Sequence, residues 1–311
     1  MLIYKLYKKI KNPQRAVIDF CKNKNYRYAH LVPDKLFVKC MYKVYTGRKL
    51  NLKNPILFNE KLQWLKLYNR NPEYINMVDK AAAKKIVSEK CGDEYVIPTV
   101  GIYDNVNDIP FDDLPNSFVI KCTHDSGSVI LCRDKASLDI PKIKEELENE
   151  LAVNFFWFGR EWPYKYVKPK IIIEKALFDE NGNAPIDYKF FCFDGSVKFF
   201  QVDFDRFSSR KSNYYDVDCN LLPFEKAKCR SDSSIEFKRP EKFSDMISAA
   251  EKLSRGLPFL RVDLYYFHNK IYFGEMTFFP GSGCLRLVSN SVDAEKIIGD
   301  MINLPKKRVE K

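Results

Sequence analysis

The sequence predicts an α+β fold, in which antiparallel strands and helices occupy separate stretches of the chain. Three pairs of strand-like runs are each joined by a short polar turn, within 117–132, 187–202 and 261–277. Short turns favour antiparallel pairing, because parallel strands need a long crossover. Apolar residues recur at helical spacing in other stretches, at 59–70, 76–90, 137–153 and 243–255. With 311 residues, the chain is long enough for one large domain or two moderate ones.

Two helices and a strand are expected in the first third of the chain. Residues 59–70 show helical spacing, and Asn59 can serve as the N-cap. A second helix over residues 76–90 ends before Gly92, which suits the left-handed position after a helix. We expect a strand at 95–98.

The next two predicted strands, 117–122 and 129–132, flank a small polar loop at 123–128. Gly127 and its small neighbours would let backbone N–H groups approach an anion closely. No helix opens after the loop, so it is neither a Walker A loop nor a GxGxxG fingerprint. Taken alone, the same composition also fits an ordinary turn.

Two further strand signals follow the helix predicted at 137–153. The run 170–177 (KIIIEKAL) is apolar and β-branched, which is typical of a strand buried on both faces. The dipeptide at 194–195 (DG) between strand-like runs is a strong hairpin signal. In that hairpin Asp187 and Lys189 share one face of their strand, because side chains alternate.

The last hairpin carries two carboxylates, Asp263 and Glu275. If the turn has an odd number of residues, with 268–270 at its tip, the two acids lie opposite each other. Arg261 and Thr277 then share their face. Opposed like charges repel unless a cation lies between them, and Mg²⁺ fits because it binds carboxylate and phosphate oxygens. Two solvated acids at the rim of the sheet are the alternative, and an even-numbered turn would separate the acids onto opposite faces.

The chain is strongly basic, with a net charge of +11. This charge indicates a polyanionic partner, such as a nucleotide, an anionic membrane, an acidic polysaccharide or a nucleic acid. We expect no nucleic acid, because the aromatic residues sit in apolar runs. The excess is concentrated in residues 1–30, which contain one acid, Asp19, and the bases Lys5, Lys8, Lys9, Lys11, Arg15, Lys22, Lys24 and Arg27. Interleaved apolar residues suggest either a helix on a membrane surface or a helix packed on its own domain.

Several absences from the sequence narrow the class of protein. No apolar run reaches the length of about 20 residues that a transmembrane helix needs. The first residues lack the apolar region of a secretory signal. The 9 cysteines form no CxxC pair, which argues against a disulfide framework and a zinc site. We therefore expect a cytoplasmic protein that could touch the inner face of the membrane through residues 1–30.

Several short motifs occur in a distinctive order. They are 58–65 (FNEKLQWL), 79–80 (DK), 114–115 (LP), 118–122 (FVIKC), 124–127 (HDSG), 161–164 (EWPY), 187–190 (DYKF), 261–265 (RVDLY) and 274–277 (GEMT). This order resembles the ATP-grasp superfamily, and more closely its TupA-like branch, named for teichuronopeptide biosynthesis, over about residues 57–290. The resemblance implies two α+β subdomains that hold ATP between antiparallel sheets, at 57–165 and 166–305. A basic helical region, 1–56, would precede this ATP-grasp domain of residues 57–305.

The resemblance also implies an activity. An ATP- and Mg²⁺-dependent carboxylate–amine ligase would form an acyl phosphate and then an amide. The acceptor would be a uronic-acid sugar of a capsular or teichuronopeptide-type surface polysaccharide, and the other substrate an amino acid or small amine. Two alternatives stay open, namely a glycosyltransferase of polysaccharide biosynthesis and a basic protein that binds membranes or nucleic acid.

Residue roles follow from the matching positions. Lys189 and Arg261 would be catalytic, because they would neutralise charge as the γ-phosphoryl group moves. Asp263, Glu275 and Thr277 would hold Mg²⁺. ATP would contact Lys80, Lys121, His124, Ser126, Gly127, Ser128, Glu174, Lys175 and Leu177, with Glu174 at the adenine amino group.

Two positions depart from the family pattern, and the acceptor site is the least specified. Thr277 stands where an asparagine is usual, and Asp125 stands where a glycine is expected in the loop. An acidic sugar would bind Arg206, Tyr164 and Arg286, since arginine binds carboxylates and aromatic faces stack on sugar rings. Taken individually, residues of these types more often lie on the surface or serve in packing.

Overall fold

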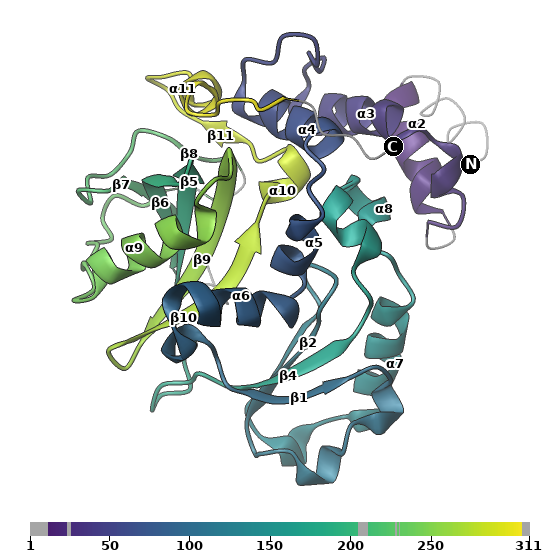
Figure 1. The fold of residues 1–311 in the computed structure, drawn as a ribbon, viewed down its shortest axis with the longest axis vertical. Helices are drawn as coiled ribbons and strands as arrows, with labels where there is room; N and C mark the ends of the chain where they lie inside the picture. Colours follow the sequence, from purple (N-terminus) through teal and green to yellow (C-terminus); the bar gives the residue numbers. More distant parts are fainter. Residues whose placement is uncertain (1–11, 24–25, 205–210, 228, 230, 307–311) are drawn as a thin grey trace.

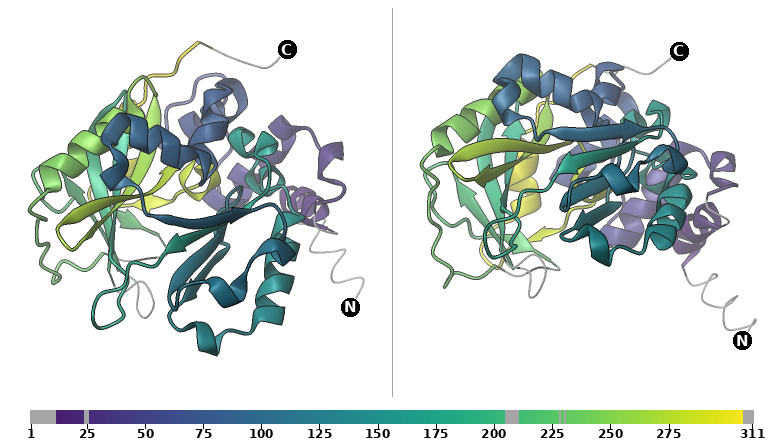
Figure 2. Two further views of the ribbon diagram at one scale, coloured as in Figure 1. Left: turned by 60° about the horizontal axis from the view of Figure 1, so that its bottom comes forward. Right: turned by 90° about the horizontal axis from the view of Figure 1, so that it is seen from below.

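The computed structural model describes residues 12–23, 26–204, 211–227, 229 and 231–306. Two antiparallel sheets form separate layers, with helices around them and the first helices at one end of the molecule (Figure 1, Figure 2). The predicted α+β class is confirmed. In the described part of the chain, no helix is both long enough and apolar enough to cross a membrane.

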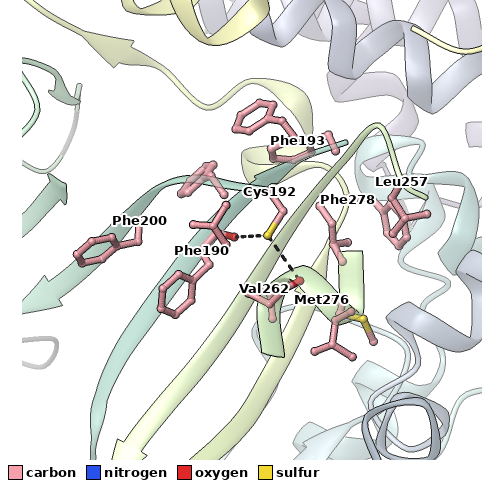
Figure 3. Close-up of a cluster of buried hydrophobic side chains, with 14 of the residues drawn as sticks. Phe190, Cys192, Phe193, Phe200, Leu257, Val262, Met276 and Phe278 are labelled. Atoms are coloured by element: carbon pink, nitrogen blue, oxygen red, sulfur yellow. Dashed lines mark hydrogen bonds between the residues drawn. The ribbon is translucent and has the colours of Figure 1, made fainter. Parts of the chain in front are cut away.

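The larger sheet has five strands in the order β10-β9-β5-β6-β7. Their bounds are β5 Ile186–Phe193, β6 Ser196–Phe204, β7 Lys211–Asp216, β9 Phe259–Phe267 and β10 Lys270–Thr277. Alternation gives the sheet one apolar face and a second face, the polar face, whose charged side chains lie in line with the buried Phe191, Phe199 and Phe259. The apolar face packs against α9 (Phe243–Ser254), and Figure 3 shows part of this core, with Phe190, Phe200, Val262 and Met276 among the labelled side chains.

The smaller sheet has four strands in the order β1-β4-β2-β3. They are β1 Thr99–Tyr103, β2 Phe118–Cys122, β3 Val129–Cys132 and β4 Ile171–Lys175. Helix α7 (Ile140–Leu151) packs Ile143 and Leu147 against the apolar residues of β2 and β4. The prediction that β4 is buried is confirmed, since Ile171, Ile172 and Ile173 are fully buried.

The remaining helices connect the sheets and extend the fold at the N-terminal end. They are α2 Pro13–Lys22, α3 Asp34–Thr46, α4 Phe58–Tyr68, α5 Glu73–Val78, α6 Ala82–Cys91, α8 Phe156–Gly159, α10 Pro280–Gly283 and α11 Ala294–Asp300. A two-stranded pair, β8 Glu225–Lys226 and β11 Leu287–Val288, completes the strands of the described residues.

Three local predictions differ from the structure. Helix α4 begins at Phe58 with Leu57 as its N-cap, and Asn59 is buried instead of capping. Residues 76–90 form parts of two helices, because the backbone N–H of Lys80 donates to the carbonyl of Thr123 and the chain leaves the helical path there. The strand expected at 95–98 begins only at Thr99.

The β9–β10 hairpin has a two-residue turn, not the odd-numbered turn that we expected. His268 and Asn269 form it, both with positive φ, at 47° and 57°. The pairing then shifts between Phe273 and Glu275, so Gly274 is an extra residue in β10. This bulge restores the register that an even turn would have lost, and Asp263 lies opposite Glu275 as predicted.

Candidate active site between the two sheets

Charged side chains gather on the polar face of the larger sheet. Lys189 of β5 pairs with Asp263 of β9, and Asp263 pairs with Glu275 of β10. Because side chains two residues apart share a face, Asp187 and Arg261 lie on the same side. Strand alternation predicted which of these residues share a face within each hairpin. The register of β5, β9 and β10 brings the two sets into contact.

Arg261 lies between the two opposed acids. Its Nε donates to Asp263 Oδ1 at 2.7 Å, and its Nη2 donates to Asp263 Oδ2 at 2.8 Å and to Glu275 Oε1 at 2.7 Å. Nη2 also donates to Thr277 Oγ1 at 3.1 Å. The cation that neutralises the opposed carboxylates in this structure is therefore a guanidinium group.

Lys189 is a second buried cation on this face. Its Nζ donates to an oxygen of Asp187 and, at 2.9 Å, to Asp263 Oδ2, and it lies 4.0 Å from Asp203 Oδ2. Burial alone would lower the pKa of Lys189, but the charges of Asp263 and Asp187 outweigh burial and raise it. The ammonium group therefore stays charged within a cluster of carboxylates.

On the facing sheet, Glu174 of β4 accepts from two lysines. Lys121 Nζ lies 2.6 Å from Glu174 Oε2, and Lys84 Nζ lies 2.5 Å from Oε1. Burial would raise the pKa of Glu174, but both lysines together lower it. Lys175 is exposed, and Leu177 is half-buried just beyond the strand.

Lys80 holds the polar loop at 123–128. Its Nζ donates to the carbonyls of Cys122 and Asp125 at 2.7 and 2.5 Å, and to Asp125 Oδ1 at 3.0 Å. Ser128 Oγ accepts from the backbone N–H of Cys122 at 3.1 Å. Ser126 and Gly127 at the tip are exposed, and Gly127 has a φ of 122° that favours glycine. The loop is thus fixed at its base and open at its tip.

A cavity of about 380 Å³ separates the two sheets, and we call it the inter-sheet cavity. Both apolar and charged side chains line it. The apolar set is Ile97, Val119, Val129, Leu131, Leu177, Phe178 and Tyr265. The polar set is Lys80, Lys121, Ser126, Glu174, Lys175, Asp187, Lys189, Asp263 and Glu275. This mixed lining offers contacts both to a flat apolar ring and to a polyanionic chain.

A second cavity, of about 630 Å³, lies beside the first, and we call it the helix-walled cavity because α2 and α3 form one side. Ser126 and Glu275 line both cavities. Arg261, Thr277 and the predicted substrate residue Tyr164 also line the helix-walled cavity. The two cavities therefore meet at the loop tip and the acidic hairpin.

Several predicted site residues lie elsewhere. His124 is buried, with its Nε2 near the carbonyls of Glu150 and Val153, so it supports the loop from behind. Arg286 lines a small separate cavity with Arg48. Arg206 lies outside the described residues.

Three residues near the cavities received no role from the sequence. Asp187 lines the inter-sheet cavity, and Lys84 holds Glu174 from behind. Glu161 lines the helix-walled cavity and accepts from Ser282 Oγ at 2.6 Å. Burial raises the pKa of Glu161, with the nearby Lys66 acting in the opposite direction. Glu161 belongs to the motif 161–164, and this motif was the feature of the sequence that could have pointed to it.

The carboxylates fit a nucleotide-bound Mg²⁺ better than a metal held by protein alone. Among the described residues, no group of three or more histidines, cysteines or acids could hold a metal ion. Asp263 and Glu275 provide hard oxygen ligands on adjacent strands, and Mg²⁺ commonly takes one or two carboxylates together with phosphate oxygens. The donor set is therefore compatible with Mg²⁺ that arrives with phosphates.

Comparisons with known proteins agree with this architecture. A family model described as "TupA-like ATPgrasp" matches residues 60–303. No curated protein matches the sequence significantly.

Solved structures that match the chain include a D-alanine–D-alanine ligase from Bacillus anthracis, at 19% identity and a TM-score of 0.40, over 79% of this chain and 68% of that one. The ATP-grasp ligase PsnB, with its minimal precursor, gives 12% identity and a TM-score of 0.40, over 78% and 65% of the two chains. The D-cycloserine synthetase DcsG gives 14% identity and a TM-score of 0.39, over 74% and 70%. The chain spans 55% of the length of a second ligase structure from Bacillus anthracis.

Proposed function

This chain belongs to the TupA-like ATP-grasp family, and from that premise we propose that it joins the carboxylate of a uronic-acid sugar to an amine. It is an ATP-dependent ligase. The proposed setting is the biosynthesis of a capsular or teichuronopeptide-type surface polysaccharide. The observation that supports the proposal best is the junction of the two cavities, where Ser126 and Glu275 line both. A phosphate in one cavity and an acid in the other would meet there.

We propose that ATP occupies the inter-sheet cavity. Its base would lie among Val119, Leu131 and Leu177, with Glu174 in reach of the adenine amino group. The triphosphate would extend toward Lys189 and the tip of the 123–128 loop, whose backbone N–H groups can face an anion. Three lysines line the same cavity, namely Lys80, Lys121 and Lys175.

Asp263 and Glu275 would hold Mg²⁺, with Thr277 beside them. A bound Mg²⁺ would neutralise charge on the β- and γ-phosphates. Arg261 already contacts both acids, so it would share the negative charge that the phosphates bring. Lys189 lies on the same face and would act on the transferring group.

The proposed reaction has two steps. A carboxylate oxygen of the sugar acid attacks the γ-phosphorus, the bond to the β-phosphate oxygen breaks, and ADP leaves. The neutral amine then attacks the carbonyl carbon, the bond to the phosphate breaks, and the amine loses a proton. The products are an amide, ADP and inorganic phosphate.

The test is an ADP-release assay with ATP, Mg²⁺, uronic acids and amino acids or small amines. We expect ADP release to require both an acid and an amine. AMP and pyrophosphate as products would contradict the acyl phosphate. Consumption of a UDP-sugar without ATP would favour the glycosyltransferase alternative.

We further propose that the enzyme is cytoplasmic and touches the inner face of the membrane through its N-terminal helices. Phe20 and Leu31 are exposed, at 44% and 61%, and two exposed arginines, Arg15 and Arg27, are close to them in the sequence, with Arg15 paired to Asp19. Apolar and basic side chains together favour an anionic lipid surface. Sedimentation with phosphatidylglycerol vesicles should capture the protein and release it at high salt. Equal recovery with neutral vesicles would contradict the proposal.

A further inference from the structure

One wall of the helix-walled cavity comes from helices that precede the region matched by the family model. The cavity is lined by Ile18 and Lys22 of α2 and by Phe37, Met41 and Tyr45 of α3. In both helices the lining residues recur every four positions, so each helix presents one stripe to the cavity. Because the match covers residues 60–303, this wall is an addition to the matched part of the chain.

The neighbouring wall, where the centre of the Phe158 ring lies 5.1 Å from Lys22 Nζ of α2, carries a series of aromatic rings. The rings of Phe158 and Phe155 stack with centroids 5.6 Å apart, and Phe155 meets Tyr164 edge-on at 4.9 Å. Phe158 is 42% exposed, whereas Tyr164 is 9% exposed. Tyr164 lines the cavity together with Arg261 and Glu275. The series therefore leads from an exposed rim to the charged junction of the two cavities.

Arg160 links the two walls by hydrogen bonds and a cation–π contact. Its Nη2 donates to the carbonyls of Ala29 and Val32 at 2.6 and 3.2 Å, and its guanidinium lies 4.8 Å from the centre of the Phe37 ring. The arginine is buried and follows α8 in sequence, so it ties the aromatic wall to α3. Figure 1 and Figure 2 show α2, α3 and α8 side by side. The wall is thus fixed to the rest of the fold.

We propose that this cavity binds an amphipathic acceptor, in which the uronic acid carries an apolar chain. The acid would lie beside Arg261, and the chain would run along the aromatic series and the stripes of α2 and α3. Ile18, Phe37 and Met41 offer no hydrogen bonds, so this part of the wall suits hydrocarbon, and Lys22 and Tyr45 are the polar members of the two stripes. The proposal rests on the proposed function, since it takes a sugar acid as the acceptor.

The test is calorimetric binding of three ligands to the full chain: methyl glucuronide, octyl glucuronide below its micelle concentration, and a uronic-acid disaccharide. We expect the octyl compound to bind at least about tenfold more tightly than the methyl compound, because burial of about two methylene groups suffices for that gain. Tyr45→Ser and Phe158→Ser, both at the exposed rim, should remove most of the gain. The matched control is Leu36→Ser, an exposed apolar residue of α3 that does not line the cavity.

Equal affinity for the methyl and octyl compounds, including no measurable binding of either, would overturn the proposal. A gain for the disaccharide without a gain for the octyl compound would also overturn it and would indicate a saccharide chain. ADP release tests the proposed function separately. An enzyme that releases ADP with a sugar acid and an amine, but shows no effect of chain length, would retain its function and lose the amphipathic acceptor.

Discussion

Asp263 faces Glu275 across β9 and β10 because Gly274 adds one residue to β10 beyond a two-residue turn. A Cβ at position 274 would lie 3.0 Å from the carbonyl oxygen of Asp263 and 3.2 Å from the ring of Tyr265. These contacts are tighter than ordinary van der Waals distances, so the bulge accommodates little beyond glycine. The relative position of the two acids therefore depends on a residue without a side chain.

Gly274→Val should disturb this arrangement. We expect the free energy of unfolding to fall by about 1–3 kcal/mol, as for other overpacked sites, and ADP release to fall by a larger proportion than stability explains. Urea unfolding and the ADP assay measure the two effects. Gly274→Ala is the milder comparison, and unchanged ADP release in the valine variant would show that the bulge does not matter for the site.

The acid sensitivity of the fold should depend on Glu275. Burial alone would raise the pKa of Glu275, but positive charge from Arg261 and Lys189 outweighs burial and lowers the pKa from 4.5 to about 2. A lowered folded pKa contributes stability above the unfolded value, and this contribution is lost as pH falls from about 4.5 to about 2. Urea unfolding at pH 5 and pH 3 should show a smaller loss for Glu275→Gln than for the wild type. Equal losses would contradict the ion pairing.

Lys121 and Lys84 both hold Glu174, but only Lys121 lines the inter-sheet cavity. Lys121→Met and Lys84→Met should each lower the free energy of unfolding by about 1.5–3 kcal/mol, because each removes a hydrogen bond to a buried charge. The affinity for a non-hydrolysable ATP analogue should fall by about tenfold or more with Lys121→Met, and by less with Lys84→Met. The same affinity loss in both variants would mean that Lys121 acts only through Glu174.

Lys80 should control the order of the polar loop. Its Nζ contacts two carbonyls and one carboxylate oxygen at the base of the loop, so Lys80→Met should speed amide hydrogen exchange in residues 123–128 and weaken binding of the ATP analogue. Lys85→Met is the matched control, because the Lys85 side chain is 82% exposed and pairs with Glu89 within α6. Unchanged amide hydrogen exchange of residues 123–128 in the Lys80 variant would contradict the proposal that Lys80 orders the loop.

Much of the fold was accessible from the sequence because the relevant signals are local. The turn at Asp194 and Gly195, both with positive φ, matches its Asp-Gly signal, and the apolar run around Ile172 became the buried β4. Strand alternation placed Lys189 on the face of Asp187 before any contact was known. These features depend on residues that are close together in the sequence, so they can be predicted from it.

The features that the sequence did not reveal depend on distant contacts. The break between α5 and α6 occurs where the backbone of Lys80 bonds to Thr123, more than forty positions later. The bulge at Gly274 cannot be separated from an odd-numbered turn by residue types alone. His124 and Arg286 had suitable chemistry, but their positions in space were set by the packing of other elements.

The central claim is that the acids on β9 and β10 bind the metal ion of a nucleotide held between the two sheets. Calorimetric titration with a non-hydrolysable ATP analogue, with Mg²⁺ and with EDTA, tests it most directly. We expect Mg²⁺ to increase the affinity of the wild type at least about tenfold, Glu275→Gln to remove most of that increase, and Glu146→Gln on exposed α7 to retain it. Equal affinity with Mg²⁺ and with EDTA in the wild type would contradict the claim.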